Sequence, residues 1–193
     1  YGFTTGSCAA AASKAAAYML LTGKLKQNIT IQTPKGILFQ TEILETTRSE
    51  TEVTCAVRKD GGDDPDITSG TLIFSTVRFA DREKKIPGQN NRQLSGIHVE
   101  AMQEKRAVIC IDGGEGVGRV TKPGLDQQVG NAAINHVPRE MITKEVLEVC
   151  RLTDYKGGLV VEIFVPEGEQ LADQTFNPRL GIKGGISILG SSG

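Results

Sequence analysis

The sequence predicts an α+β fold of two layers, in which a mostly antiparallel or mixed sheet is covered by a few helices. Several short segments alternate apolar and polar residues, which is typical of strands with one buried face. Only two segments have clear helical character. Turns rather than helices join neighbouring strand segments, which argues against a doubly wound parallel sheet.

The first expected element is an alanine-rich helix over residues 7–22. Alanine has the highest helix propensity, and Thr5 or Ser7 can accept a hydrogen bond at the helix N-terminus. Gly23 can adopt the left-handed conformation that ends many helices. Because alanines lie on all sides of this helix, we expect it to pack closely against a sheet or a ligand.

The remaining elements follow from the same patterns. Residues 28–33 and 37–46 flank a Pro-Lys-Gly turn and predict a β-hairpin. Further strands are expected at 52–59, 71–80, 97–101, 107–111 and 158–166, and a polar loop at 81–95. A second helix is expected at 143–152, with Thr143 as its N-terminal cap.

Length and composition favour a single domain, residues 1–193, with a formal net charge of -1. This charge argues against a nucleic-acid-binding protein and an anionic membrane surface, and no segment is long and apolar enough to span a membrane. The four cysteines are far apart, which predicts reduced thiols, a cytoplasmic location and no metal site. The chain starts without Met, and we expect it to be a piece of a longer protein.

Residues 112–118, DGGEGVG, have the letters of a glycine-rich S-adenosylmethionine (SAM) motif after an expected strand. In Rossmann domains a helix begins directly after such glycines, and its N-terminus lies against the ligand. Here Val120, Pro123 and Gly124 follow, which argues against a helix. Two interpretations stay open, a plain glycine turn and an anion-binding nest assisted by Arg119 and Lys122; we favour the nest.

Three further segments could carry chemistry. The turn at 60–66 holds four carboxylates, which either bond their own backbone in a solvated turn or act as acid, base or cation attractant. Loops 130–139 and 175–181 both place Asn near Arg. Either these arginines bind a substrate with several carboxylates, or they are unrelated arginines on the surface. The glycine-rich end at 184–193 suggests an ATP-dependent small-molecule phosphotransferase, although the lysine of a Walker loop is absent.

Five segments together resemble the cobalt-precorrin-5B C(1)-methyltransferase family of the CbiD type. They are YGFTTGSCAAAASKAA (1–16), KDGGDDPDIT (59–68), IDGGEGVGRVTKPGL (111–125), GNAAINHVPREMI (130–142) and TFNPRLGIKGGISILG (175–190). The segments occur in the order of the family and reach from one end of the chain to the other, with His136 standing where proline is expected. The family is longer, so the chain resembles the N-terminal part of a two-domain enzyme whose C-terminal domain is absent.

The resemblance implies SAM-dependent methylation of carbon 1 of cobalt-precorrin-5B in anaerobic cobalamin (vitamin B12) biosynthesis. SAM is then the methyl donor, and cobalt is present only as part of the substrate. The partners that the resemblance implies are an anionic cobalt-tetrapyrrole and other enzymes of the pathway. Charge and composition, as above, predict neither a nucleic acid nor a membrane as partner. The alternatives are the phosphotransferase and a non-catalytic corrinoid-binding module.

No catalytic residues are carried over from the family; the residue types and the requirements of methyl transfer suggest the following roles, as hypotheses. Asp63, Asp64 and Asp66 are the catalytic candidates, as a base or in orientation rather than as direct partners of the sulfonium. The cofactor candidates are Gly113, Gly114, Glu115, Gly116 and Gly118. The substrate candidates are Thr4, Thr5, Arg119, Lys122, Asn135, Arg139, Asn177 and Arg179. Replacing Arg139 or Arg179 with alanine is expected to raise the substrate KM with little change in the fold.

Overall fold

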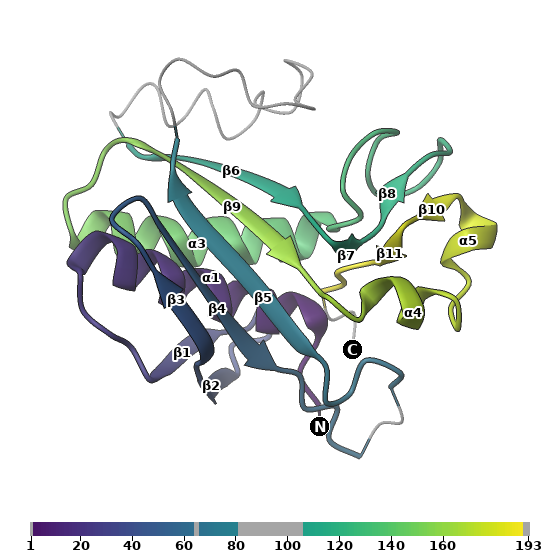
Figure 1. The fold of residues 1–193 in the computed structure, drawn as a ribbon, viewed down its shortest axis with the longest axis horizontal. Helices are drawn as coiled ribbons and strands as arrows, with labels where there is room; N and C mark the ends of the chain where they lie inside the picture. The colour runs from purple at the N-terminus through teal and green to yellow at the C-terminus, as the bar shows by residue number, and fades with distance from the viewer. Residues whose placement is uncertain (1, 64–65, 81–105, 191–193) are drawn as a thin grey trace.

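A five-stranded mixed sheet forms the centre of the computed structural model, which describes residues 2–63, 66–80 and 106–190. The strand order is β3-β4-β5-β9-β6 (Figure 1). All neighbours are antiparallel except β6 and β9, which run parallel. The strands are β3 (Leu44–Arg48), β4 (Glu52–Arg58), β5 (Leu72–Phe79), β6 (Val108–Gly113) and β9 (Gly158–Phe164). The α+β class with a mixed sheet is confirmed.

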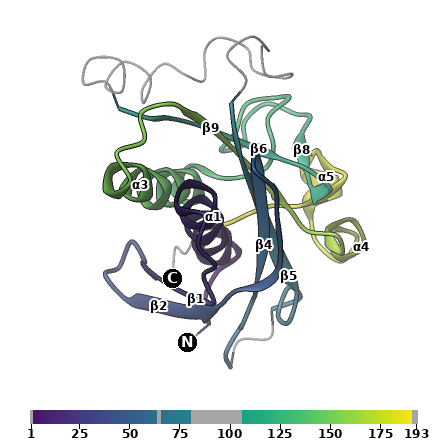
Figure 2. The same cartoon turned by 60° about the vertical axis from the view of Figure 1, so that its left-hand side comes forward.

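Two long helices, α1 (Thr5–Thr22) and α3 (His136–Leu152), lie side by side on one face of this sheet (Figure 2). The hairpin of β1 (Asn28–Gln32) and β2 (Leu38–Glu42) covers α1 from the other side. Every alanine of α1 is fully buried, because the small side chains let the sheet, α3 and the hairpin approach the helix closely.

Contacts between α1 and the sheet show how closely they pack. The Cys55 thiol of β4 donates to the carbonyl of Ala12 over 3.2 Å. The Ser13 hydroxyl lies 2.8 Å from the Ser75 hydroxyl of β5. Burial raises the pKa of the Cys8 and Cys55 thiols to about 12, so both stay protonated and pack as small hydrophobic groups.

The ends of α1 differ slightly from expectation. Thr4, rather than Thr5 or Ser7, caps the helix, and its hydroxyl accepts the Ser7 N–H at 3.1 Å. Thr5 is the first residue of the helix and so follows the cap, and its hydroxyl is bonded to Leu189 instead. Gly23 takes the left-handed conformation expected of it, with φ 70°.

Two boundaries of elements predicted from the sequence were wrong. The helix expected at 143–152 begins at His136, and Thr143 is a buried interior residue. Pro138 argued against a helix at this point in the sequence. Proline is nevertheless tolerated in the first turn of a helix, because the N–H groups there have no intrahelical acceptor. The expected strand 37–46 divides at Ile43, because β2 pairs with β1 whereas β3 joins the central sheet. The expected loop at 81–95 and strand at 97–101 lie outside the described residues.

A lobe of short elements extends from one end of the sheet (Figure 1). It contains β7 (Gly116–Val117), β8 (Arg119–Val120), α4 (Gly168–Ala172), α5 (Asn177–Leu180), β10 (Ile182–Lys183) and β11 (Gly185–Ile186). β8 pairs antiparallel with β10, and β7 pairs parallel with β11. None of the helices in the described ranges is both long and apolar enough to cross a membrane.

Candidate functional site

A cleft of about 910 Å³ opens where three distant segments meet: the start of α1, the turn after β4, and the segment from 175 to 190. Its volume is near the upper end of the roughly 300–1,000 Å³ typical of small-molecule sites. Five residues predicted from the sequence line this cleft: Thr4, Thr5, Asp63, Asp66 and Asn177. The cleft is therefore the part of the described chain where catalytic and substrate candidates come together.

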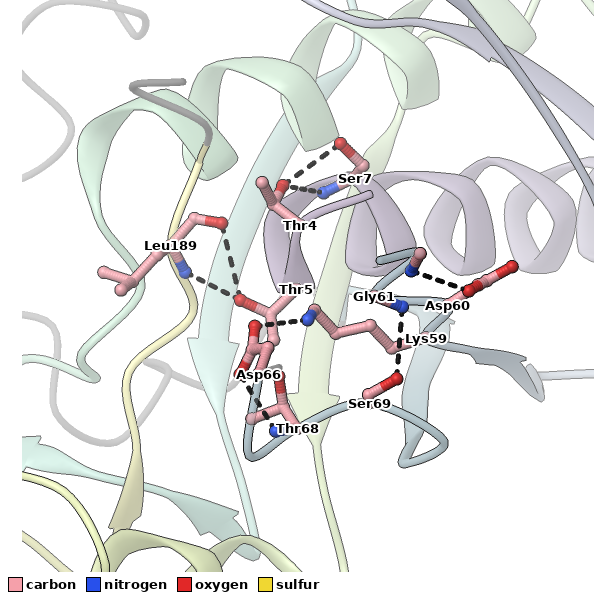
Figure 3. Close-up of polar contacts among 11 residues, drawn as sticks. Thr4, Thr5, Ser7, Lys59, Asp60, Gly61, Asp66, Thr68, Ser69 and Leu189 are labelled. Atoms are coloured by element: carbon pink, nitrogen blue, oxygen red, sulfur yellow. Dashed lines mark hydrogen bonds and ion pairs between the residues drawn. The ribbon is translucent and has the colours of Figure 1, made fainter. Parts of the chain in front are cut away.

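The floor of the cleft holds a buried cation. The Lys59 side chain is only 3% exposed, and its Nζ donates to Asp66 Oδ2 (Figure 3). Asp66 Oδ1 accepts the backbone N–H and the hydroxyl of Thr68, both at 2.9 Å. Partial burial acts to raise the pKa of Asp66, but the bonds from Lys59 and Thr68 outweigh it and hold the pKa below its ordinary value. Asp66 is thus a fixed, ionised carboxylate, which favours an orienting role over that of a base.

One wall of the cleft is the N-terminus of α1, tied to the far end of the chain. The Thr5 hydroxyl accepts the Leu189 N–H at 2.9 Å (Figure 3). The Gly6 N–H donates to the Leu189 carbonyl at 2.8 Å. A Cβ on Gly6 would lie 2.7 Å from that carbonyl oxygen, so the glycine permits the contact. The positive end of the helix dipole therefore lies at the cleft.

The acidic turn supplies the second wall. Asp60 Oδ1 accepts the Gly62 N–H at 2.8 Å, as in a turn that bonds its own backbone, and the Asp60 carbonyl accepts the Phe3 N–H at 3.0 Å. Asp63 is exposed and lines the cleft. Asp64 lies outside the described residues. Both open interpretations of the turn keep support, since Asp60 is structural whereas Asp63 and Asp66 border a cavity.

Apolar side chains form the rim. Ile67, Phe176, Leu180 and Leu189 line the cleft with 36%, 73%, 48% and 49% of their surface exposed. Asn177 lies among them, and its side-chain amide donates to the Gly185 carbonyl and the Ser187 hydroxyl, both at 3.2 Å. A group of exposed apolar residues around a polar floor is typical of a ligand site.

The glycine stretch 113–118 does not line the cleft. A Cβ on Gly116 would lie 1.6 Å from the Val165 carbonyl oxygen, and one on Gly118 would lie 2.4 Å from the Ile182 side chain. The chain continues into β7 and β8 rather than into a helix, in agreement with the rejection of a Rossmann motif. These glycines let backbone segments of the lobe approach one another, and their assignment to a cofactor stays a prediction.

The basic substrate candidates also lie outside the cleft, and two of them bond the protein itself. Arg119 Nη2 lies 3.0 Å from Asp112 Oδ1 and donates to the Gly113 carbonyl at 2.9 Å. Arg139 donates to three backbone carbonyls. Lys122 and Arg179 are exposed, and Asn135 precedes the first residue of α3.

The glycine-rich end that suggested a phosphotransferase is built into the fold as far as the structure describes it. Gly185 packs on the backbone of Gly116, and the Ile188 N–H donates to the Ala133 carbonyl at 2.8 Å. The Ile188 N–H is committed in this way and is not available to bind a phosphate. Across the described ranges, no group of three or more His, Cys, Asp and Glu side chains is placed to hold a metal ion.

Lys59 was not identified from the sequence as a site residue, although the pattern of β4 indicates that its side chain is buried. Val53, Cys55 and Val57 alternate along the buried face of β4, and Lys59 continues that alternation by two residues. A lysine in phase with a buried strand face, next to an acidic turn, predicts a buried cation paired with a carboxylate.

His136 provides a pH-dependent contact away from the cleft. Its ring Nδ1 bonds Asp126, whose other oxygen accepts the His136 backbone N–H at 2.9 Å. The bond to Asp126 and the charge of that carboxylate raise the pKa of His136 above its ordinary value. The pair therefore contributes stability that is fully present below about pH 6.5 and is lost as the pH rises through the folded-state pKa.

We expect Asp126→Asn to return the His136 pKa toward about 6.5. The measurement is an NMR titration of the imidazole, with the signal assigned by His136→Gln. Asp173→Asn, at an exposed carboxylate elsewhere on the surface, is the matched control and is expected to leave the pKa unchanged. An unshifted pKa in Asp126→Asn contradicts the contact.

The comparisons with known proteins agree on one family. The model of the CbiD family matches residues 1–193. A Thermoanaerobacter sp. protein named cobalt-precorrin-5B C(1)-methyltransferase is 50% identical over all of this chain and 45% of its own length. A protein of the same name from Ruminiclostridium cellulolyticum is 46% identical over all of this chain and 44% of its own length. The chain thus spans less than half of these relatives.

A solved structure extends the agreement to the fold. The crystal structure of the cobalamin biosynthesis protein cbiD from Archaeoglobus fulgidus matches with a TM-score of 0.63 at 27% identity. The match covers 98% of this chain and 51% of that one. With the family model matched from the first residue to the last, the chain belongs to the CbiD family.

Proposed function

We propose that this chain is part of an enzyme that transfers a methyl group from SAM to carbon 1 of cobalt-precorrin-5B in anaerobic cobalamin biosynthesis. The supporting observation is the match of 46–50% identity, along the whole chain, to relatives named for this reaction. Because the chain covers less than half of those relatives, the activity is proposed for the protein that contains it.

The cleft offers what such a reaction needs from the protein. Methyl transfer to carbon is an in-line displacement, so the main task is to hold donor and acceptor in line and to exclude water. SAM, when bound, supplies the electrophilic methyl group. Lys59 and Thr68 fix Asp66 in one position, and the rim formed by Phe176 and Leu180 can shield a bound ligand from solvent. Asp63 lies exposed at the cleft, where its carboxylate can contact a bound ligand.

The substrate is proposed to meet the basic side chains next to the cleft. Arg179 lies on the same short helix, α5, as Asn177 and Leu180, which line the cleft. The Lys122 side chain packs against Gly181, directly after that helix. Exposed cations at this place can pair with the acetate and propionate arms of a tetrapyrrole. The described cysteines are all free, which supports a reducing location, the cytoplasm.

The test is incubation of the protein with cobalt-precorrin-5B and isotopically methyl-labelled SAM. We expect one labelled methyl group on the tetrapyrrole and an equal amount of S-adenosylhomocysteine, both measured by mass spectrometry. Transfer of phosphate from ATP without any methyl transfer would support the phosphotransferase. Binding of the tetrapyrrole with no transfer from either donor would support a non-catalytic corrinoid-binding module.

A further inference from the structure

We infer that the cleft at the start of α1 is the site of the methyl donor rather than of the tetrapyrrole. In this arrangement the zwitterionic amino-acid end of the donor lies between Lys59 and the two carboxylates Asp63 and Asp66, and its adenosyl group lies on the apolar rim. The inference rests on the proposed function, since it names which ligand of that reaction the cleft takes.

The charged residues of the cleft favour the methyl donor over the tetrapyrrole. The charged residues that line it, among those described, are one cation, Lys59, and two carboxylates, Asp63 and Asp66. A tetrapyrrole with several carboxylate arms would be repelled by this excess of negative charge. A donor that carries an ammonium group, a sulfonium group and a single carboxylate is attracted to it.

The positions of these charges match an amino acid. Lys59 Nζ donates to Asp66 but has three donors, and it lies at the floor next to Thr5, where α1 begins (Figure 3). A carboxylate there would meet both a buried ammonium and the positive end of a helix of 18 residues. Asp63 and the outer side of Asp66, which is 42% exposed, remain to receive the ammonium group.

The rim matches the remaining part of the donor. Phe176 is 73% exposed, the largest exposure among the apolar residues of the cleft, and Leu180 and Ile67 are exposed beside it. An aromatic ring that is exposed at a cavity offers a surface on which a purine can stack. The exposed basic residues Lys122 and Arg179 do not line the cleft, so the tetrapyrrole arms have a separate place.

The experiment is calorimetric titration of the chain with three probes: S-adenosylhomocysteine, methylthioadenosine, which lacks the amino-acid end, and uroporphyrin, a tetrapyrrole with acetate and propionate arms. Phe176→Ala is expected to weaken both adenosyl probes about tenfold. Asp63→Asn is expected to weaken only S-adenosylhomocysteine, by a similar factor. Both residues are exposed, so neither change should disturb the fold, and Leu152→Ala and Asp173→Asn are matched controls outside the cleft.

Several results would overturn the inference without touching the proposed function, which the methyl-transfer assay tests separately. One is binding of S-adenosylhomocysteine that neither Phe176→Ala nor Asp63→Asn weakens. Another is no binding of S-adenosylhomocysteine at all, because every residue invoked belongs to this chain. A third is uroporphyrin binding that depends on Phe176, which would make the cleft a tetrapyrrole site.

Discussion

Replacing Gly116 with alanine is expected to destabilise the protein by about 4 kcal/mol or more. The new Cβ would lie 1.6 Å from the carbonyl oxygen of Val165, and the same residue has φ +73°, where any side chain is strained. A backbone carbonyl cannot rotate away as a side chain can, so the segments around β7 would have to separate. The measurement is the free energy of unfolding from urea denaturation.

Gly130→Ala is the matched control for this prediction. Gly130 has φ +92°, but no atom lies within 4 Å of the position its Cβ would take. The substitution therefore carries only the backbone strain, about 1 kcal/mol. The difference between the two variants isolates the close approach at Gly116. Equal destabilisation of the two variants would show that the close contact of Gly116 with Val165 does not contribute to stability. A stable Gly116→Ala protein that no longer binds S-adenosylhomocysteine would support the assignment of this glycine to the cofactor.

The glycines of residues 112–118 show why a sequence motif alone could not identify the cofactor site. A backbone that approaches a cofactor and a backbone that approaches another strand both require glycine, and the sequence does not distinguish them. The residues after the motif were more informative, because Val120 and Pro123 indicated that no helix follows. Local signals also predicted α1, through the helix propensity of its alanines, and the central strands, through their alternation of apolar and polar residues.

Contacts between distant residues were not predictable in the same way. Thr5 and Leu189 are 184 positions apart, yet their bond closes one wall of the cleft. The paired strands of the lobe, such as β7 with β11, have two residues each, too few for any period to emerge. The sequence thus identified five of the residues that line the cleft, but it could not predict that Thr4, Asp66 and Asn177 meet there.

Arg139 and Arg179 occur in similar sequence contexts, but we expect their alanine variants to differ in stability. Arg139 Nε donates to the Ile134 carbonyl at 2.6 Å and Nη2 to the Ala132 carbonyl at 3.1 Å, so the side chain joins α3 to the segment before it. Burial lowers the pKa of its guanidinium, which nevertheless stays charged at neutral pH. Arg139→Ala leaves these carbonyls without their charged donor and should cost about 3 kcal/mol of unfolding free energy.

Arg179→Ala is the control within the same pair, because Arg179 is exposed on α5. Its unfolding free energy should change by less than about 0.5 kcal/mol, while the substrate KM rises if the side chain grips a carboxylate arm. Urea denaturation and steady-state kinetics on both variants separate the roles. An Arg139→Ala protein of unchanged stability and raised KM would return Arg139 to the substrate site. A destabilised Arg139→Ala beside a stable Arg179→Ala would make Arg139 a structural link, because only a side chain whose donors serve the fold itself can lower stability in the absence of substrate.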